Sequence, residues 1–179
     1  MPEAEEKIDI QKLRGYRCFA CGTANPIGLN MEFYRLGDSV CSDITLGRYH
    51  EGWEQMAHGG IVSTLLDEVM SWTIMYFKKV FLVTRKIQIK YIKPVPLEIP
   101  LTVLGKIVTQ EAPPRIEAVG EIRDENGSLL VRSLGEFVML PEEKLSSVSQ
   151  GFKNDILSLF EAFGQPDDSL SYRRRGVSN

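Results

Sequence analysis

The residues best suited to chemistry stand at the start of one long apolar segment. His58-Gly59-Gly60 precedes a run from Ile61 to about Phe77 that contains good helix formers and neither Pro nor Gly. The first turn of a helix presents backbone N–H groups without intrahelical partners, and glycine leaves them open to a ligand. Such a turn can polarise a carbonyl or hold an oxyanion. The same glycines also suit a plain turn from loop to helix.

Two adjacent carboxylates, Asp67 and Glu68, lie in the middle of the same predicted helix. A carboxylate in an apolar helix is unfavourable unless it is paired or used, and activation of a water molecule is one such use. Neighbouring helical residues project about 100° apart, so we expect at most one of the two to face a reaction site. The alternative is that both lie at a polar edge or form ion pairs, for example with Lys78 or Arg85.

The distance between Gly59 and Asp67 leads to a further expectation. Gly59 and Asp67 are eight residues apart, which is about 12 Å along one helix. They cannot both touch one reacting carbonyl within one chain. If both act on the same bond, they come from different subunits, which predicts a symmetric dimer with two sites.

Cys18-Phe-Ala-Cys21 has the spacing of half a zinc site, with Cys41, His50 and His58 as further candidate ligands. The sequence contains no second close ligand pair. We therefore expect no metal and interpret the two cysteines as loop residues that pack locally. A structural zinc protein is the alternative, and no cysteine is placed beside His58 as a nucleophile.

Short alternating patterns on both sides of the helix predict strands. They cover Met31–Arg35 and Val40–Leu46, joined at a Gly37-Asp38 turn, then Val83–Lys93, Leu101–Val108, Arg115–Arg123 and Leu129–Leu140. In the third segment, alternation places Val83 and Ile87 on one face of the strand, and Thr84 and Lys86 on the other face. An Asn126-Gly127 pair indicates a hairpin before the last strand. The order predicts an α+β domain, an antiparallel sheet of five to six strands wrapped around a helix buried on all sides.

The chain of 179 residues fits one domain with short additions. We expect an N-terminal extension over 1–16, suited to a short docking helix or a frayed terminus, and a domain over 17–140. Phe152, Leu159 and Phe163 recur at helical spacing and predict an amphipathic helix within 141–179, packed on the body or on a partner and followed by a disordered tail from 164.

Composition excludes several classes of function. The formal charge of −3 gives no bias towards nucleic acid, and the acidic N-terminus does not resemble a secretory signal. The longest apolar stretch is too short to span a bilayer, so we expect no membrane anchor. Three cysteines suit a reducing compartment. These features predict a cytoplasmic protein.

The run HGGIVSTLLDEVMSW, residues 58–72, is similar to the central-helix motif of the hotdog-fold acyl-CoA thioesterases, in particular the PaaI-like group of the 4-hydroxybenzoyl-CoA thioesterase superfamily. The flanking CFACGTANPIGLNMEF and TRKIQIKYIKPVPL extend the resemblance over about 17–140. It implies a hotdog fold, hydrolysis of acyl-CoA without a metal or redox cofactor, and homodimers that can pair into tetramers.

The resemblance also assigns residues. It implies Asp67 as general base or nucleophile, the Gly59 backbone N–H as the donor to the carbonyl, His58 as an orienting residue, and Thr84 as a hydroxyl that orients water or the carboxylate. The expected substrate-binding residues are Gly60, Gln55, Glu68, Arg85 and Lys93, with Lys90 as a further cation for the phosphates of CoA. Related enzymes often place Asn or Gln six residues before the motif His, where this chain has Gly52. That departure keeps a non-catalytic acyl-CoA or small-ligand binding protein as the alternative.

Overall fold

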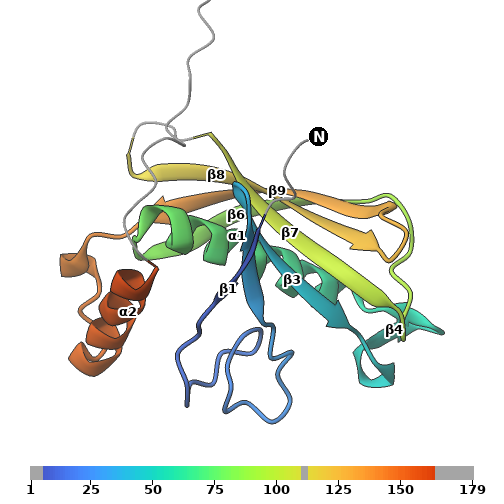
Figure 1. Cartoon of the computed structure of the whole chain (residues 1–179), viewed down its shortest axis with the longest axis horizontal. Coiled ribbons are helices and arrows are strands. Elements are labelled where there is room, and N and C mark those ends of the chain that lie inside the picture. The colour runs from blue at the N-terminus through green and yellow to red at the C-terminus, as the bar shows by residue number, and fades with distance from the viewer. Residues whose placement is uncertain (1–5, 110–112, 164–179) are drawn as a thin grey trace, which may run out of the picture.

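Seven strands form one antiparallel sheet in the order β1-β2-β3-β7-β8-β9-β6 (Figure 1). The computed structural model describes residues 6–109 and 113–163. The strands of the sheet are β1 Lys7–Ile10, β2 Phe33–Leu36, β3 Ser39–Thr45, β6 Leu82–Tyr91, β7 Pro100–Thr109, β8 Arg115–Asp124 and β9 Leu129–Met139. A separate two-stranded sheet pairs β4 Glu51–Trp53 with β5 Met56–Ala57, and short 3-10 turns cover Arg48–His50 and Glu142–Lys144. The α+β prediction is confirmed, with seven strands in the main sheet where five to six were predicted.

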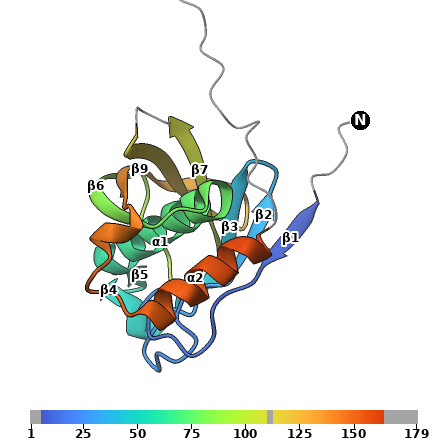
Figure 2. The same cartoon turned by 90° about the vertical axis from the view of Figure 1, so that its left-hand side faces the viewer.

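Helix α1, Gly59–Lys78, lies against the sheet, which curves around it (Figure 2). It begins two residues before the predicted start, because the His58 side chain caps it by accepting a hydrogen bond from the Gly60 N–H. It ends at Lys79, whose φ of 53° is left-handed. Its sheet-facing side chains form the centre of the core, and five of the apolar ones are 0% exposed: Leu65, Leu66, Val69, Met70 and Ile74.

Two glycines allow α1 to approach the middle of the sheet closely. Gly105 and Gly120 pair directly across β7 and β8. A Cβ on Gly105 would lie 2.8 Å from the Val69 carbonyl oxygen, and one on Gly120 would lie 3.0 Å from the Leu66 side chain. Larger residues at these positions would push the helix away, so the glycines fix how deeply α1 sits.

The side of α1 away from the sheet is only half-buried. Ser63, Thr64, Asp67 and Ser71 lie along this side. The prediction of burial on all sides is therefore wrong for the single chain. Within the described residues no helix is long and apolar enough to cross a membrane.

A bulge in β6 changes which face Thr84 occupies. Thr84 pairs with Phe137 and Lys86 with Glu136, so Arg85 is the extra residue between them. Phe137 is 1% exposed, and its direct partner Thr84 therefore shares the face that α1 covers. The alternation predicted Thr84 and Lys86 on one face and Val83 with Ile87 on the other. That prediction is wrong because the bulge shifts the alternation by one residue.

The N-terminal extension contains a strand where a docking helix or a frayed terminus was expected. β1 pairs with β2, with Ile10 opposite Phe33, and Ile10 is 5% exposed. Burial of this side chain at the sheet edge explains why the segment is extended instead of helical. It supplies the additional edge strand of the main sheet.

The predicted C-terminal helix is present as α2, Gln150–Ala162, which lies beside α1 and packs on the body of the chain (Figure 2). The Ser149 side chain caps its start by accepting from the Phe152 N–H. Phe160 contacts Phe81 with ring centroids 5.7 Å apart, and Phe163, just past the helix, lies 6.3 Å from Trp72. The tail predicted to be disordered, 164–179, lies outside the described residues.

Candidate functional site

The first turn of α1 contains an open backbone donor at Gly59. The Gly60 N–H donates to His58 Nδ1 at 3.0 Å, so this amide, expected to bind substrate, is already occupied. The neighbouring Gly59 N–H has no hydrogen-bond partner in the described part of the chain, as expected for the first residue of a helix. Because Nδ1 accepts, a neutral His58 carries its proton on Nε2. The structure thus leaves the Gly59 amide available for an oxygen atom.

Gly52 packs directly against this turn. A Cβ at position 52 would lie 2.8 Å from His58 Cα and 3.2 Å from His58 Cβ. The His58 N–H also donates to the His50 carbonyl at 2.8 Å, which holds the two segments together. Glycine at the position where related enzymes often carry Asn or Gln therefore has a steric reason in this chain.

Tyr91, which no sequence pattern singles out, lies beside Gly59. Its hydroxyl donates to the Gly59 carbonyl at 2.9 Å, and Ser63 Oγ donates to the same oxygen at 2.8 Å. Ser63 follows Gly59 by four residues, so its contact is a usual one along a helix. Tyr91 is 32 residues away in the chain, and only the packing of β6 against α1 brings it there.

Asp67 meets Thr84 on the half-buried side of α1. Thr84 Oγ1 donates to Asp67 Oδ1 at 2.7 Å, which fixes one carboxylate oxygen and leaves Oδ2 without a partner in the described residues. The β6 bulge makes this contact possible, because it turns Thr84 towards the helix. The structure therefore brings together two of the predicted catalytic residues. Gly59 lies about 12 Å along the same helix, beyond the reach of a carbonyl held at Asp67.

Glu68, the next residue, points to a different part of the molecule. Its Oε1 accepts from Trp72 Nε1 at 2.9 Å, and the Cys18 thiol lies 3.8 and 3.9 Å from the two carboxylate oxygens. Burial raises the pKa of Glu68 to about 7. A role in substrate binding stays a prediction, and its observed neighbours are Trp72 of α1 and the cysteines of the N-terminal loop.

The two cysteines of that loop differ in their surroundings. A hydrogen bond from the Cys21 thiol, together with backbone N–H groups of Cys21 and Ala20, lowers the pKa of Cys18 to about 5. The pKa of Cys21 is raised, because its hydrogen bond to Cys18 favours the protonated form. Ligand atoms of Cys18, Cys21 and Glu68 all lie within 4.8 Å of one another. His50, His58 and Cys41, the other candidate ligands, are not in this group.

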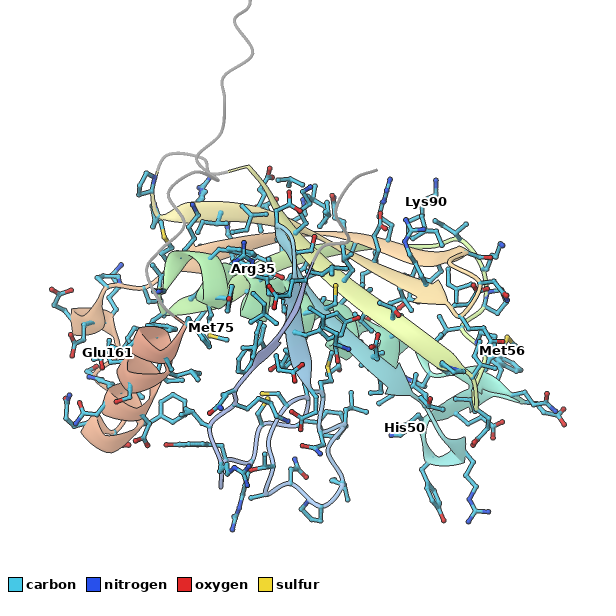
Figure 3. The ribbon with its side chains drawn as sticks, viewed as in Figure 1. Arg35, His50, Met56, Met75, Lys90 and Glu161 are labelled. Carbon is cyan, nitrogen blue, oxygen red and sulfur yellow. The ribbon has the colours of Figure 1, made fainter. Side chains whose placement is uncertain are left out.

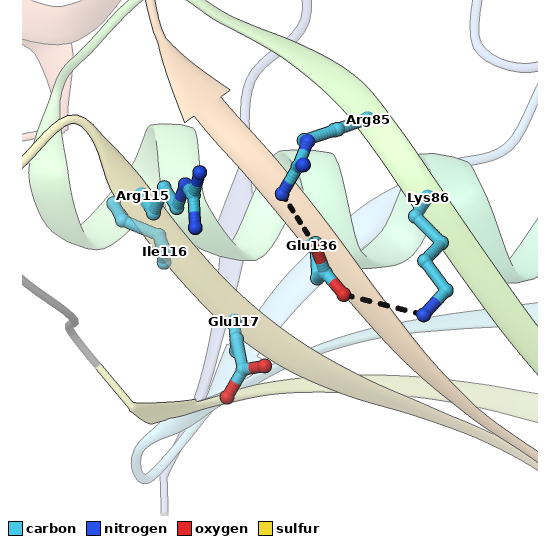
Figure 4. Close-up of a pocket in the computed structure, with 6 residues that line it drawn as sticks. All are labelled: Arg85, Lys86, Arg115, Ile116, Glu117 and Glu136. Atoms are coloured by element: carbon cyan, nitrogen blue, oxygen red, sulfur yellow. Dashed lines mark hydrogen bonds and ion pairs between the residues drawn. The ribbon is translucent and has the colours of Figure 1, made fainter.

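The basic residues expected to hold CoA phosphates are spread along β6. Arg85 is ion-paired with Glu136 at 3.0 Å, beside a cavity of about 490 Å³ on the side of the sheet away from α1 (Figure 4). Lys93 follows the other end of the strand, roughly 25 Å away along an extended chain. Arg85 and Lys93 therefore cannot bind the same phosphate within one chain.

Lys90 and Gln55 lie in two further places. Lys90 points away from the sheet (Figure 3). Gln55 stands between β4 and β5 with a φ of 59°, and its backbone N–H donates to Glu51 Oε1 at 2.6 Å. No hydrogen bond joins the Gln55 side chain to the other predicted site residues that the structure describes.

The sequence pattern of the thioesterase superfamily matches residues 54–130, which include α1 and both residues of the Asp67 and Thr84 pair. Residues 54–130 of the hotdog domain therefore resemble the thioesterase superfamily in sequence. The predicted fold and family resemblance are confirmed at this level. A search of curated protein sequences found no match.

Solved structures of thioesterases share the fold. The thioesterase superfamily protein RHA08564 is 30% identical with a TM-score of 0.60, over 64% of this chain and 56% of that protein, so this chain spans little more than half of its length. The Escherichia coli PaaI protein from the phenylacetic acid degradation operon is 15% identical with a TM-score of 0.57, over 63% and 81%. The protein smu.793 from Streptococcus mutans, solved with acetyl CoA, is 17% identical with a TM-score of 0.60, over 73% and 97%.

Proposed function

We propose that this protein is an acyl-CoA thioesterase that hydrolyses an acyl thioester to a free acid and CoA. The observation that carries the proposal is the Asp67 carboxylate, held by Thr84 at 2.7 Å on the half-buried side of α1. The open Gly59 amide and the resemblance to the thioesterase superfamily support it. The PaaI-like subgroup is part of the same proposal.

In the proposed reaction, the Gly59 N–H donates a hydrogen bond to the thioester carbonyl oxygen and stabilises the negative charge that develops there. Asp67 takes a proton from a water molecule, and the water oxygen attacks the carbonyl carbon. The tetrahedral intermediate then breaks its C–S bond, and the sulfur leaves as the CoA thiol with the proton that Asp67 accepted. Thr84 holds the carboxylate in the orientation that this proton transfer needs. Direct attack by Asp67 on the carbonyl carbon is the second form of the same chemistry.

The proposal requires two subunits at each site, because Gly59 and Asp67 of one chain are about 12 Å apart. Two features of the single chain support a homodimer. β6 stands at the end of the sheet with ten residues and no neighbour on its outer side among the described strands. The half-buried side of α1, which carries Asp67, is a second surface that a partner subunit would cover.

For the CoA moiety, we propose that the phosphates bind near Lys93 and Lys90. The end of β6 lies beside Gly59, since Tyr91 bonds its carbonyl. Lys93 forms no side-chain ion pair within 4 Å in the described part of the chain, whereas Arg85 is engaged by Glu136. The acetyl CoA held by the Streptococcus mutans protein supports a CoA ester as the ligand class.

The test is release of free thiol from a panel of short, medium, long and aromatic acyl-CoAs by the natural protein and by Asp67→Asn. We expect turnover of at least one ester and its loss in the variant. Normal turnover by Asp67→Asn would overturn the role of that residue. Thermal stabilisation by CoA esters without product would instead identify a binding protein and reject the proposed hydrolysis.

A further inference from the structure

The cluster of Cys18, Cys21 and Glu68 lies outside the proposed thioester site. The two cysteines come from the loop before β2, and the carboxylate comes from α1, 47 residues after Cys21. Their ligand atoms lie within 4.8 Å of one another, although the two segments are remote in sequence. The proposed hydrolysis uses none of the three.

The spacing of these atoms suits a tetrahedral metal ion. With metal distances of about 2.3 Å to sulfur and about 2.0 Å to oxygen, tetrahedral angles place sulfur and oxygen about 3.5 Å apart and two sulfurs about 3.8 Å apart. Cys18 Sγ lies 3.8 and 3.9 Å from the Glu68 oxygens. The separation of Cys18 and Glu68 is therefore within a few tenths of an ångström of the spacing that a shared metal ion requires.

The cysteine loop is held in place by its own contacts. The Gly22 N–H donates to the Cys18 carbonyl at 3.0 Å, and a Cβ on Gly22 would lie 2.5 Å from the Cys18 backbone nitrogen and oxygen. Lys12, whose side chain is 5% exposed, donates from Nζ to the Cys21 carbonyl at 3.1 Å and to the Met31 carbonyl at 2.8 Å. The tight turn thus presents both sulfurs towards α1 before any ligand binds.

The charge around Glu68 also points to a cation. Its hydrogen-bond donors are the neutral Trp72 indole and the thiols of Cys18 and Cys21, and no Lys or Arg forms an ion pair with it in the described residues. A partly buried carboxylate without a cationic partner is unfavourable, and two sulfur atoms lie beside it. A divalent cation would supply the missing positive charge and bind all three groups.

We propose that Cys18, Cys21 and Glu68 bind one zinc ion, with a solvent molecule in the fourth position. Thiolate ligands select Zn²⁺ over Mg²⁺ or Ca²⁺, and the C-x-x-C pair supplies two of them from one turn. The ion ties the N-terminal loop to α1, one residue from Asp67. The binding does not depend on the proposed hydrolysis and is testable without it.

The experiment uses the full chain, reduced and freed of metal, and titrates it with Co²⁺ alone as a spectroscopic substitute for zinc. We expect one Co²⁺ per chain, with the visible bands of tetrahedral cobalt and a thiolate charge-transfer band, and displacement by Zn²⁺. Cys18→Ser and Cys21→Ser abolish the charge-transfer band or weaken affinity by well over tenfold. Glu68→Gln weakens affinity by at least about tenfold, since even residues behind a metal ligand cost 10–100-fold.

Cys41→Ala is the matched control, because it removes a buried thiol that is not in the cluster. It should bind Co²⁺ like the natural protein, and far-ultraviolet circular dichroism checks that every variant is folded. Zinc should also raise the unfolding temperature of the natural protein and of Cys41→Ala, but not of Cys18→Ser. Absence of a thiolate band in the reduced natural protein, or an unchanged band in Cys18→Ser, would overturn the proposal.

Discussion

Asp67 and Glu68 are neighbours in the sequence, but their carboxylates lie in two different regions of the molecule. Asp67 faces the half-buried side of α1 and accepts from a hydroxyl of β6. Glu68 faces the N-terminal loop, where it accepts from Trp72 and lies beside a thiol. The turn of about 100° per residue separates them, so one helical turn serves two sites of different chemistry.

Different elements of the fold position the two carboxylates. A sheet edge and its bulge position Asp67, whereas a tight loop fixed by the buried Lys12 surrounds Glu68. The first arrangement leaves an oxygen open for a reacting water. The second arrangement places two cysteine sulfur atoms, which are soft metal ligands, beside the Glu68 carboxylate. Variants that affect one region and leave the other intact test whether the two are separate.

Among changes that leave Asp67 itself intact, the largest effect on hydrolysis is expected for Gly59→Pro. Proline at the first helical position is well tolerated, and His58 already has the extended ψ of 134° that a following proline needs. The change removes the Gly59 N–H and adds a ring whose Cβ would lie 3.3 Å from the Tyr91 hydroxyl, so kcat for acyl-CoA should fall by about 10²–10³. Gly59→Ala keeps the N–H and should lose less than tenfold. Equal losses in the two variants would show that side-chain space matters there, and not the amide.

Thr84→Val removes the hydroxyl that orients Asp67 and keeps the shape of the side chain. We expect kcat to fall by about 10–100-fold, because a small misplacement of the carboxylate impairs proton transfer. Thr84→Ser retains the hydroxyl and should recover most of the rate. Cobalt binding at the Glu68 side should be the same in both variants, and a Thr84→Val enzyme with full kcat would contradict the positioning role.

Gly52→Ala tests whether the loop before α1 is as closely packed as the contacts indicate. The new Cβ meets His58 Cα at 2.8 Å, so we expect a loss of about 1–3 kcal/mol in the free energy of unfolding, measured with denaturant. Gly47→Ala is the control in the same segment, since its Cβ would meet only Glu98 Oε1 at 3.6 Å. Equal stability of the two variants would remove the steric reason for Gly52.

The smallest effect is expected on the Glu68 side for Trp72→Phe. Phenylalanine can keep the ring contact with Phe33, whose centroid lies 4.5 Å away, but it loses the indole N–H that orients Glu68. Cobalt affinity should fall by about tenfold, as for other residues that orient a metal ligand. A titration unchanged by this substitution would show that the indole does not position the carboxylate.

Much of the fold follows from the sequence because periodicity records which side chains face the core. The long helix and the strands around it could be predicted in this way. Both hairpin turns could be predicted from their turn residues, since Gly37 and Gly127 have φ values of 56° and 77° in the predicted turns. The β1 strand was missed because four residues with a single buried side chain, Ile10, carry too little pattern, and only pairing with β2 makes them extended.

The parts of the site that depend on residue type and helix geometry could be predicted from the sequence. The parts that depend on tertiary packing could not. The opposite directions of Asp67 and Glu68 follow from helix geometry. The β6 bulge does not, because alternation cannot show an inserted residue, and Thr84 was therefore given the wrong face. Tyr91 beside Gly59, and Glu68 beside Cys18, depend on segments remote in the chain and leave no local signal.

The most direct test of whether Asp67 and Glu68 serve two separate sites measures Asp67→Asn and Glu68→Gln side by side for acyl-CoA hydrolysis and for Co²⁺ binding. We predict that Asp67→Asn loses about 10²–10⁴-fold in kcat/KM and binds Co²⁺ normally. Glu68→Gln should lose at least tenfold in Co²⁺ affinity and less than tenfold in kcat/KM. Normal hydrolysis by Asp67→Asn, or loss of both properties in each variant, would contradict the account.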